Sequence, residues 1–510
     1  MSEIFSDSKS FVDMKLRINP EIVLARFQHL LNQTENRNPS VEQIKNFVSE
    51  YFECGVKLDE VEPEDWKTDL PFTSALNLDI AEFCLEINRR WKMLGRRTGE
   101  DVNKNPELFS LLPLPYTAVV PGGRFREIYY WDTYWILRGL LVSNMLDTAR
   151  GMVENLVFLL EKLGFVPNGG RVYYTRSQPP LLASMVWDYY LQSGDVPWTL
   201  SKVGSLEKEW YYWLRNHSVD VQGKTMFRYC CSEETPRPES YREDYSLAEN
   251  LDIEDRGELF KELRSAAESG WDFSSRWFDD PEKGDLSSTS VRNILPVDLN
   301  SFLAKSAKII ADVHKLAGNR DQENIWMERA DKLIENIEEL MWNDEEGTWF
   351  DLEISTLKQR KYFFASNLTP LWANAVPTQD LKMKGRRSVE YIQKVGALNN
   401  PEGIPTTFIQ SGQQWDFPNV WPPLEHMIIT GLGRCKDESA DKLARELTKT
   451  TISRNLQVFK SQGHMFEKYD CRSTETGGGS GGEYSVQLGF GWSNGVSLDL
   501  IHMYPELWQS

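Results

Sequence analysis

The 510-residue chain lacks the long apolar segments and leaders that mark membrane and secreted proteins. No uninterrupted apolar run approaches the roughly 18 to 20 residues that a membrane-spanning helix needs. The opening residues, MSEIFSDSKSFVDMK, also lack a basic and then apolar leader. We therefore expect no membrane segment and a cytoplasmic location, with secretion as the alternative if a leader is missing from this sequence.

Positive charge is scarce as well. Lys and Arg together number 57 against 76 Asp plus Glu, so the formal net charge is −19. Because such a surface repels a phosphate backbone, we expect no nucleic-acid partner. With 40% hydrophobic and 26% charged residues, the composition is that of an ordinary globular protein with a large core.

Motifs for metal binding and for phosphate binding are absent from the sequence. The six histidines are dispersed without an HExxH pattern, no GxxxxGK[ST] loop occurs, and the six cysteines lack metal spacing, which indicates free thiols. The sequence therefore predicts neither a metal nor a cofactor. Asp and Glu are abundant, which favours acid–base catalysis by two carboxyl groups, although spacing alone does not identify the pair.

Helical periodicity dominates the rest of the chain. Ile80, Phe83, Ile87, Trp91 and Leu94 fall on one face of a predicted helix, and the apolar positions of 148–163 and 301–316 repeat this pattern. Ser40 with Gln43 predicts a capping box. Further helices are expected over 21–32, 41–52, 133–145, 181–192, 206–216, 257–268, 322–341, 380–395 and 438–455.

Long loops rich in Gly, Pro and aromatic residues separate many of these helices, and no linker divides the chain. Such loops commonly carry function. We expect one all-α catalytic domain over 1–510, a toroid of helical hairpins with a pocket at one end, and a helical extension over 1–70 packed on it. We also expect a monomer. The loops in question are 114–131, 164–180, 232–255, 396–423 and 463–494.

Several of these loops contain the same combination of residues, aromatic rings beside charged groups. Four tryptophans directly precede an aspartate, at 131–132, 187–188, 271–272 and 415–416. Sugars pack their C–H faces on rings, and their hydroxyls bind carboxylates and guanidinium groups in pairs. The alternative is that the tryptophans fill a core and the aspartates cap helices. The arginines of NGGRVYYTRSQPP (168–180) and PRPES (236–240) could equally lie in surface turns.

The stretch TETGGGSGGEYSVQLGFGWSNG, over 474–495, has the composition of a flexible linker. Helix-like aromatic sequence follows it directly, so a loop that closes over a pocket is the favoured interpretation.

Two long motifs resemble a known family. PGGRFREIYYWDTY (121–134) and QWDFPNVWPP (414–423) are similar to the diagnostic motifs of the trehalases of glycoside hydrolase family 37. The resemblance runs from about Asp7 to about residue 505, and DSKSFVDMKL is similar to the start of the mature animal enzymes. It implies an (α/α)6 toroid that hydrolyses α,α-trehalose to two glucose molecules with inversion.

The resemblance also assigns residues. It implies that Asp272 in SGWDFSSRW is the general acid and that Glu467 in FEKYD is the general base. Glu483 corresponds to a further pocket carboxylate, and Gln414, Trp415 and Asp416 are expected to line the same pocket. The positions that correspond to sugar contacts are Arg124, Trp131, Asp132, Asn168, Arg176, Ser177, Gln178, Arg237, Glu239 and Gly270.

Inversion requires the two carboxyl groups to lie roughly 6.5 to 9.5 Å apart, so that water fits between the base and the anomeric carbon. We expect burial beside Trp271 to keep Asp272 protonated while Glu467 stays ionised. One departure from the family is Ser480, which interrupts the glycine run before Glu483. The alternatives are another toroidal α-glucosidase and an inactive trehalose-binding sensor, which the intact carboxyl pair disfavours.

Overall fold

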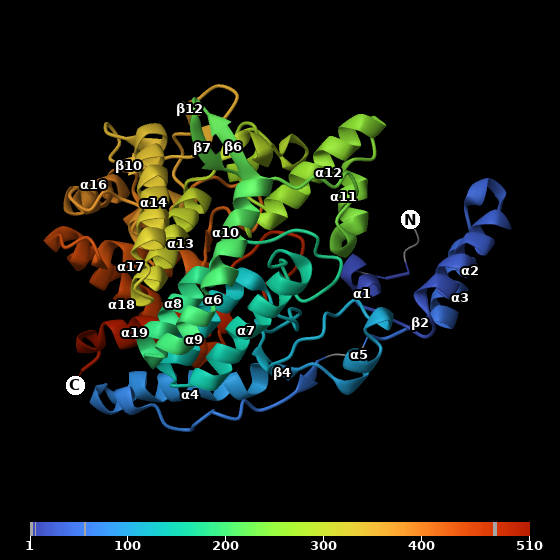
Figure 1. Ribbon diagram of the computed structural model, residues 1–510, viewed down its shortest axis with the longest axis horizontal. Helices are drawn as coiled ribbons and strands as arrows, with labels where there is room; N and C mark the ends of the chain where they lie inside the picture. Colours follow the sequence, from blue (N-terminus) through green and yellow to red (C-terminus); the bar gives the residue numbers. More distant parts are fainter. Residues whose placement is uncertain (1–3, 6, 56–57, 473–476, 510) are drawn as a thin grey trace.

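The computed structural model describes residues 4–5, 7–55, 58–472 and 477–509 and consists mainly of α-helices (Figure 1). The helices predicted from periodicity are present with shifted ends. Ser40 and Gln43 form the expected capping box at the start of α3. These helices are α2 (Pro20–Asn32), α3 (Val41–Tyr51), α4 (Leu78–Leu94), α6 (Tyr130–Val142), α7 (Leu146–Leu163), α8 (Leu182–Ser193), α10 (Val203–His217), α12 (Ile253–Glu268), α13 (Val297–Leu316), α14 (Arg320–Met341), α16 (Leu381–Lys394) and α18 (Glu438–Gln462).

Six helices form an inner ring in which each contacts the next and the last returns to the first: α6, α8, α13, α15 (Thr369–Ala373), α17 (Pro422–Gly433) and α19 (Gly491–Met503). Almost every residue of α6, α17 and α19 is buried, so these helices are enclosed on all sides. α17 is predominantly apolar and α15 has only five residues, so neither has a periodic pattern of polar and apolar residues. Periodicity therefore did not predict α15 or α17.

A second layer of amphipathic helices surrounds this ring. α4, α7, α10, α14 and α18 pack against its outside, and α16 packs against α18. The protein is therefore an all-α toroid of helical hairpins, as the sequence predicted. Outside these two layers, α2, α3 and α12 are the longer helices. The short ones are α1 (Ser8–Val12), α5 (Glu100–Lys104), α9 (Val196–Ser201) and α11 (Tyr241–Leu247).

The strands are short and pair locally or between loops. β13 (Asn419–Val420) pairs antiparallel with β14 (Tyr469–Asp470), with Asn419 opposite Asp470. This pairing brings the motif at 414–423 beside the segment that carries Glu467. The other strands are β1 (Lys15–Leu16), β2 (Phe52–Glu53), β3 (Asp59–Glu60), β4 (Gly95–Arg97), β5 (Ala118–Val119), β6 (Ser218–Val221), β7 (Lys224–Phe227), β8 (Ile294–Leu295), β9 (Trp342–Asn343), β10 (Thr348–Trp349), β11 (Leu352–Glu353) and β12 (Lys358–Gln359).

The N-terminal helices differ in how they meet the toroid. α1 packs against the short 3₁₀ helix η4 (Pro238–Ser240), which belongs to the RPES loop. α2 and α3 contact each other through Phe27 and Phe47, whose ring centroids lie 5.2 Å apart. Both helices lie at one edge of the molecule in Figure 1, away from the ring. The domain division expected from the sequence, with 1–70 as an extension, stays a prediction.

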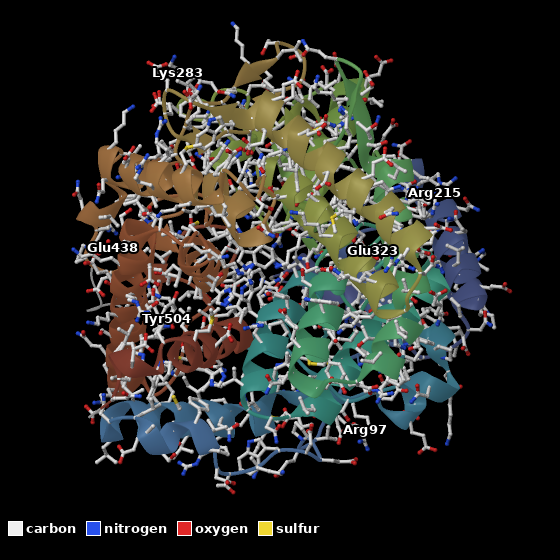
Figure 2. All side chains as sticks on the ribbon, turned by 60° about the vertical axis from the view of Figure 1, so that its left-hand side comes forward. Arg97, Arg215, Lys283, Glu323, Glu438 and Tyr504 are labelled. Carbon is white, nitrogen blue, oxygen red and sulfur yellow. The ribbon has the colours of Figure 1, made fainter. Side chains whose placement is uncertain are left out.

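The surface carries the charged groups that the composition requires. Arg215, Lys283 and Glu438 lie at the periphery of the side-chain view in Figure 2, and all three are exposed. All six cysteines are unpaired. In the part of the chain that the structure describes, no helix has both the length and the apolar character to cross a membrane.

Candidate active site

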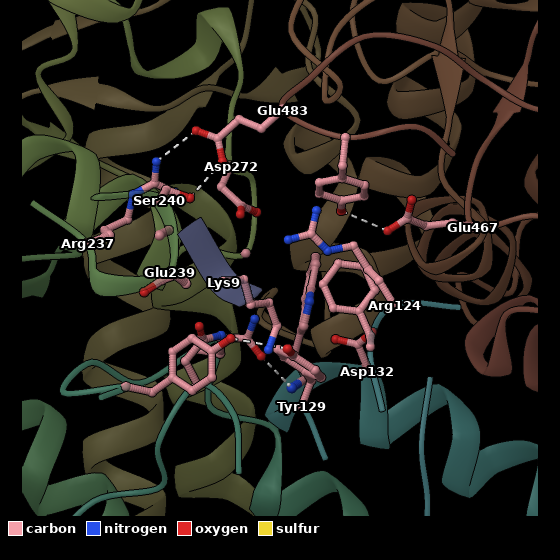
Figure 3. Close-up of a pocket in the computed structure, with 18 of the residues that line it drawn as sticks. Lys9, Arg124, Tyr129, Asp132, Arg237, Glu239, Ser240, Asp272, Glu467 and Glu483 are labelled. Carbon is pink, nitrogen blue, oxygen red and sulfur yellow. Dashed lines mark hydrogen bonds and ion pairs between the residues drawn. The ribbon is translucent and has the colours of Figure 1, made fainter. Parts of the chain in front are cut away.

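A cavity contains most of the predicted site residues (Figure 3). Asp272 and Glu467 both line it, and Figure 3 shows them on opposite sides. The other predicted residues that line it are Arg124, Trp131, Asp132, Asn168, Arg176, Gln178, Arg237, Glu239, Gly270, Trp415 and Glu483.

Asp272 lies in the turn that follows α12. Its backbone carbonyl accepts a 2.5 Å hydrogen bond from Gln414 Nε2, and its side chain is partly exposed to the cavity. Burial raises the pKa of the Asp272 carboxyl to about 7, Arg237 opposes this rise and Glu483 adds to it. Asp272 can therefore hold a proton at pH values where an ordinary aspartate is ionised.

Glu467 lies between α18 and β14, and its side chain is buried. Its backbone N–H donates to the Gln487 carbonyl at 3.0 Å, and Trp492 Nε1 donates to the Glu467 carbonyl at 2.8 Å. Tyr484 Oη donates to Oε1 at 2.9 Å, whereas Oε2 has no hydrogen-bond partner among the described residues. Burial raises the pKa of Glu467, and Lys468, Tyr484 and Arg124 oppose that rise.

Two further charged groups accompany Glu467. Asp132 is a buried residue of α6, and burial followed by the charge of Glu467 raises its pKa well above the usual value. Arg124 lies with its guanidinium carbon 4.8 Å from the centre of the Tyr484 ring, and it pairs with Asp7 at 3.1 Å. The carboxyl groups of Asp132 and Glu467 therefore repel one another when both are ionised.

The opposite wall contains arginine–carboxylate pairs. Arg176 Nη2 donates to Glu239 Oε1 at 2.6 Å and to Asn168 Oδ1 at 3.0 Å. Arg176 Nε and Nη1 and Glu239 Oε2 are buried without hydrogen-bond partners among the described residues. Buried polar atoms are rarely left unpaired. Two donors and one acceptor are therefore available in this wall for a polyhydroxyl ligand.

Arg237 forms a second such cluster. Its Nη2 reaches Asp244 Oδ1 at 2.6 Å and Glu483 Oε1 at 2.8 Å, and Ser240 Oγ donates to Glu483 Oε2 at 3.1 Å. Glu483 is thereby held at the edge of the cavity by two donors. Asp244 fixes the guanidinium in turn, because it accepts bonds from Arg237 Nε and from its backbone N–H.

Stacked indole rings lie at the cavity, which Trp415 and Trp421 line. The Trp415 ring lies 3.7 Å from that of Trp421 and 5.4 Å from that of Trp271, nearly parallel to both. Gly270 has φ +76°, and a Cβ atom there would lie 2.8 Å from the Trp131 ring. Both the backbone angle and the close approach require glycine at this position.

Three predicted residues are not among those that line the cavity: Ser177, Gln414 and Asp416. Ser177 Oγ donates to the Val166 carbonyl. Asp416 is fully buried and accepts bonds from Ser274, Ser275 and Ser411, so it ties the loop after Asp272 to the 409–417 loop. Their predicted contact with a sugar stays a prediction.

Sequence reasoning missed Lys9, which reaches the cavity from α1. Its Nζ pairs with Asp13 and with Glu127, each at 2.7 Å. Glu127 Oε1 in turn accepts the Tyr129 hydroxyl at 2.9 Å. The only signal was DSKSFVDMKL, which supported the resemblance but carried no role. Phe125 and Tyr129, aromatic residues of the motif at 121–134, also line the cavity. The further lining residues that sequence reasoning missed are Tyr174, Ser240, Ala267, Trp421, Tyr484, Phe490 and Trp492.

The site offers carboxyl, guanidinium and aromatic groups to a ligand. Among the described residues, no three His, Cys, Asp or Glu side chains are grouped so that they could hold a metal ion. The arrangement suits a neutral, hydroxyl-rich molecule placed between two carboxyl groups.

Comparisons with known proteins identify the relatives of this chain. A family model described as Trehalase matches residues 3–505. The chain is 42% identical to the trehalase of Bombyx mori over 514 residues, covering 99% of this chain and 88% of that protein. It is 38% identical to the trehalase of Homo sapiens, covering 99% and 87% of the two chains.

Solved structures show the same similarity. The neutral trehalase of Saccharomyces cerevisiae superimposes with a TM-score of 0.62 at 26% identity, covering 76% of this chain and 74% of that chain. A mannosylglycerate hydrolase from Thermus thermophilus shares the fold, with a TM-score of 0.52 at 16% identity over 75% and 95% of the two chains.

Proposed function

The chain belongs to the trehalase family and hydrolyses trehalose, and we propose that in this reaction Asp272 is the general acid and Glu467 the general base. The observation that carries the assignment is that the two carboxyl groups line one cavity from opposite sides. The pKa of about 7 at Asp272 supports its role, because an acid must hold a proton at working pH.

The reaction follows from this arrangement. Glu467 takes a proton from a water molecule, whose oxygen attacks the anomeric carbon from the face opposite to the leaving sugar. Asp272 gives its proton to the glycosidic oxygen as the bond between that oxygen and the anomeric carbon breaks. One glucose leaves with its configuration inverted and the other with it unchanged. The unpartnered Oε2 of Glu467 is the oxygen we assign to the water.

The remaining wall residues bind the two sugars in this proposal. Arg176, Glu239 and Asn168 hold the hydroxyls of one glucose, and Arg237 with Glu483 adds contacts at the edge. Arg124 and Asp132 hold the hydroxyls of the other, with Trp131 and Trp415 beside its apolar face. Ser177, Gln414 and Asp416 support these walls from behind.

Proton NMR of fresh reaction mixtures tests the activity and the stereochemistry together. We expect equal initial amounts of α- and β-glucose from trehalose and no glucose from maltose. Cleavage of maltose would favour a broader α-glucosidase, and a single initial anomer would refute inversion. Tight binding of trehalose without turnover would indicate a sensor.

Variants of the two carboxyl groups test the assignment. Asp272→Asn and Glu467→Gln should each lower kcat by at least about a hundredfold, the lower end of what acid–base catalysis contributes. Asp285→Asn, at an exposed site, serves as the control and should leave kcat unchanged. Ordinary turnover in either carboxyl variant would refute the role given to that residue.

We also propose that the protein is a cytoplasmic monomer. Six unpaired cysteines, four of them buried, are compatible with a reducing compartment. Light scattering of the purified protein and fractionation of the cells that produce it test the two parts separately.

A further inference from the structure

Lys468 directly follows the proposed base, and its side chain is fully buried. Its Nζ donates to Gln414 Oε1 at 2.8 Å and lies 3.4 Å from the Gly481 carbonyl oxygen. The ammonium also lies 5.1 Å from the centre of the Trp421 ring. In the described part of the chain it forms no direct ion pair with a carboxylate.

Burying an ammonium group without a carboxylate partner costs folding free energy, which indicates that this group has a function. Burial lowers the pKa of Lys468 to about 8, and the charges of Glu467 and Asp272 oppose that change. At neutral pH the group is therefore still a cation, and the two carboxyl groups it senses are the proposed base and acid.

Gln414 connects Lys468 to the backbone of Asp272, the proposed acid. Its side-chain oxygen accepts from Lys468, and its Nε2 donates to the backbone carbonyl of Asp272. The Gln414 backbone is fixed as well, since its carbonyl accepts from Trp421 Nε1 at 3.0 Å. One short chain of hydrogen bonds thus joins the segment of the base to the segment of the acid.

We propose that Lys468 is a positioning residue for the reaction, an inference that rests on the proposed roles of Asp272 and Glu467. Its charge keeps Glu467 ionised as the base, and its hydrogen bond to Gln414 fixes the backbone that carries Asp272.

The other charged groups around Glu467 do not replace Lys468. Asp132 on α6 repels the ionised base, and Asp272 on the far side of the cavity adds negative charge when it ionises. Tyr484 from the glycine-rich loop donates one hydrogen bond without carrying charge. Arg124 is a second cation, but it is already paired with Asp7. Lys468 is the cation in this group without such a pair.

The charge of Lys468 determines the direction in which the pKa of Glu467 changes when Lys468 is replaced. A nearby cation favours the carboxylate, so neutralising Lys468 raises the pKa of Glu467. Because the base acts in its ionised form, the acid limb of the kcat/KM profile must then move to higher pH. An interaction of one unit charge over several ångströms near a protein site corresponds to about one pH unit.

Four variants separate charge from hydrogen bonding. K468Q keeps a donor without charge, K468M removes both, and K468R keeps the charge. For K468Q and K468M we expect the acid limb of kcat/KM on trehalose to move up by about one pH unit, whereas K468R keeps the wild-type limb. Q414M keeps the charge and breaks the chain, so we expect kcat to fall severalfold with an unmoved acid limb.

The outcomes distinguish a failure of the role proposed for Lys468 from a failure of the roles proposed for Asp272 and Glu467. Full turnover in Glu467→Gln would remove the proposed base, and with it the basis for Lys468. A disabled Glu467→Gln together with wild-type acid limbs in K468Q and K468M would overturn the role of Lys468 alone. Circular dichroism confirms folding of each variant, and if K468M does not fold, the comparison of K468Q with K468R decides the question.

Discussion

Replacing Asp272 with asparagine should stabilise the folded protein at alkaline pH while it abolishes activity. Burial raises the pKa of this carboxyl from its usual value of 3.8 to about 7. The folded state therefore disfavours the charged form, so stability is greatest below the unfolded pKa and is lost as pH rises through the folded one. Above pH 7 the loss is complete.

The magnitude follows from the same two values. At 1.36 kcal/mol for each pKa unit, the cost of holding an ionised Asp272 reaches about 4 kcal/mol above pH 7. An asparagine amide keeps part of the burial cost, so we expect a gain of about 2 to 4 kcal/mol at pH 8 and almost none at pH 4. In a chain of 510 residues, one kcal/mol moves Tm by about 1 °C.

Thermal unfolding of wild type and Asp272→Asn at pH 4, 6 and 8 measures this difference. Asp499→Asn is the matched control with the opposite sign. Burial opposes ionisation of Asp499, yet Arg138 and His426 lower its pKa below the usual value. Its variant should lose stability at pH 8 and lose less as the pH falls. An Asp272→Asn protein that gains equally at pH 4 and pH 8, or that is destabilised at pH 8, would refute the reasoning.

Three further predictions address the cavity. Gly270→Ala should lower kcat/KM at least about tenfold with circular dichroism unchanged, since its Cβ would meet the Trp131 ring at 2.8 Å; steady-state kinetics at wild-type levels would contradict the close approach. Lys9→Met removes one of the two cations paired with buried Glu127, the other being Arg171 at 3.4 Å, and should cost about 2 kcal/mol in urea unfolding. Adding Glu127→Gln should restore part of this loss, and an equally unstable double variant would argue against charge as the cause. The kcat/KM profile should fall above about pH 7 as Asp272 ionises, and a rate that stays constant to pH 9 would rule out this residue as the acid.

The outer helices could be predicted from the sequence because one face of each meets water. α4 and α14 repeat apolar residues at helical spacing, and the structure has helices there with ends shifted by a few residues. α15 and α17 belong to the inner ring and are buried on all sides. Neither has a regular pattern of polar and apolar residues that could mark it as a helix. The stretch 474–495 was also predicted as one loop, whereas α19 begins within it at Gly491; residues 474–476 lie outside the described residues.

Site residues could be predicted where they belong to a long sequence motif. They were harder to predict where their position depends on contacts with distant segments of the chain. Asp272 and Glu467 come from motifs, and both line the cavity. Asp416 shares the Trp-Asp pattern with Asp132, yet hydroxyl groups of serines surround it in the wall. Lys9 reaches the cavity only because α1 packs on the RPES loop. Local sequence cannot contain information about contacts between segments this far apart.

The closure of the ring through α6 and α19 has a consequence for biosynthesis. Arg138 on α6 donates to Asp499 on α19 across 361 positions of the chain. While the polypeptide is still emerging from the ribosome, the apolar flank of α6 has no partner, because α19 has yet to be translated. A nascent chain stalled before Gly491 therefore exposes this flank to chaperones and to aggregation. The enzyme can therefore become active only after α19 has been synthesised and has closed the ring.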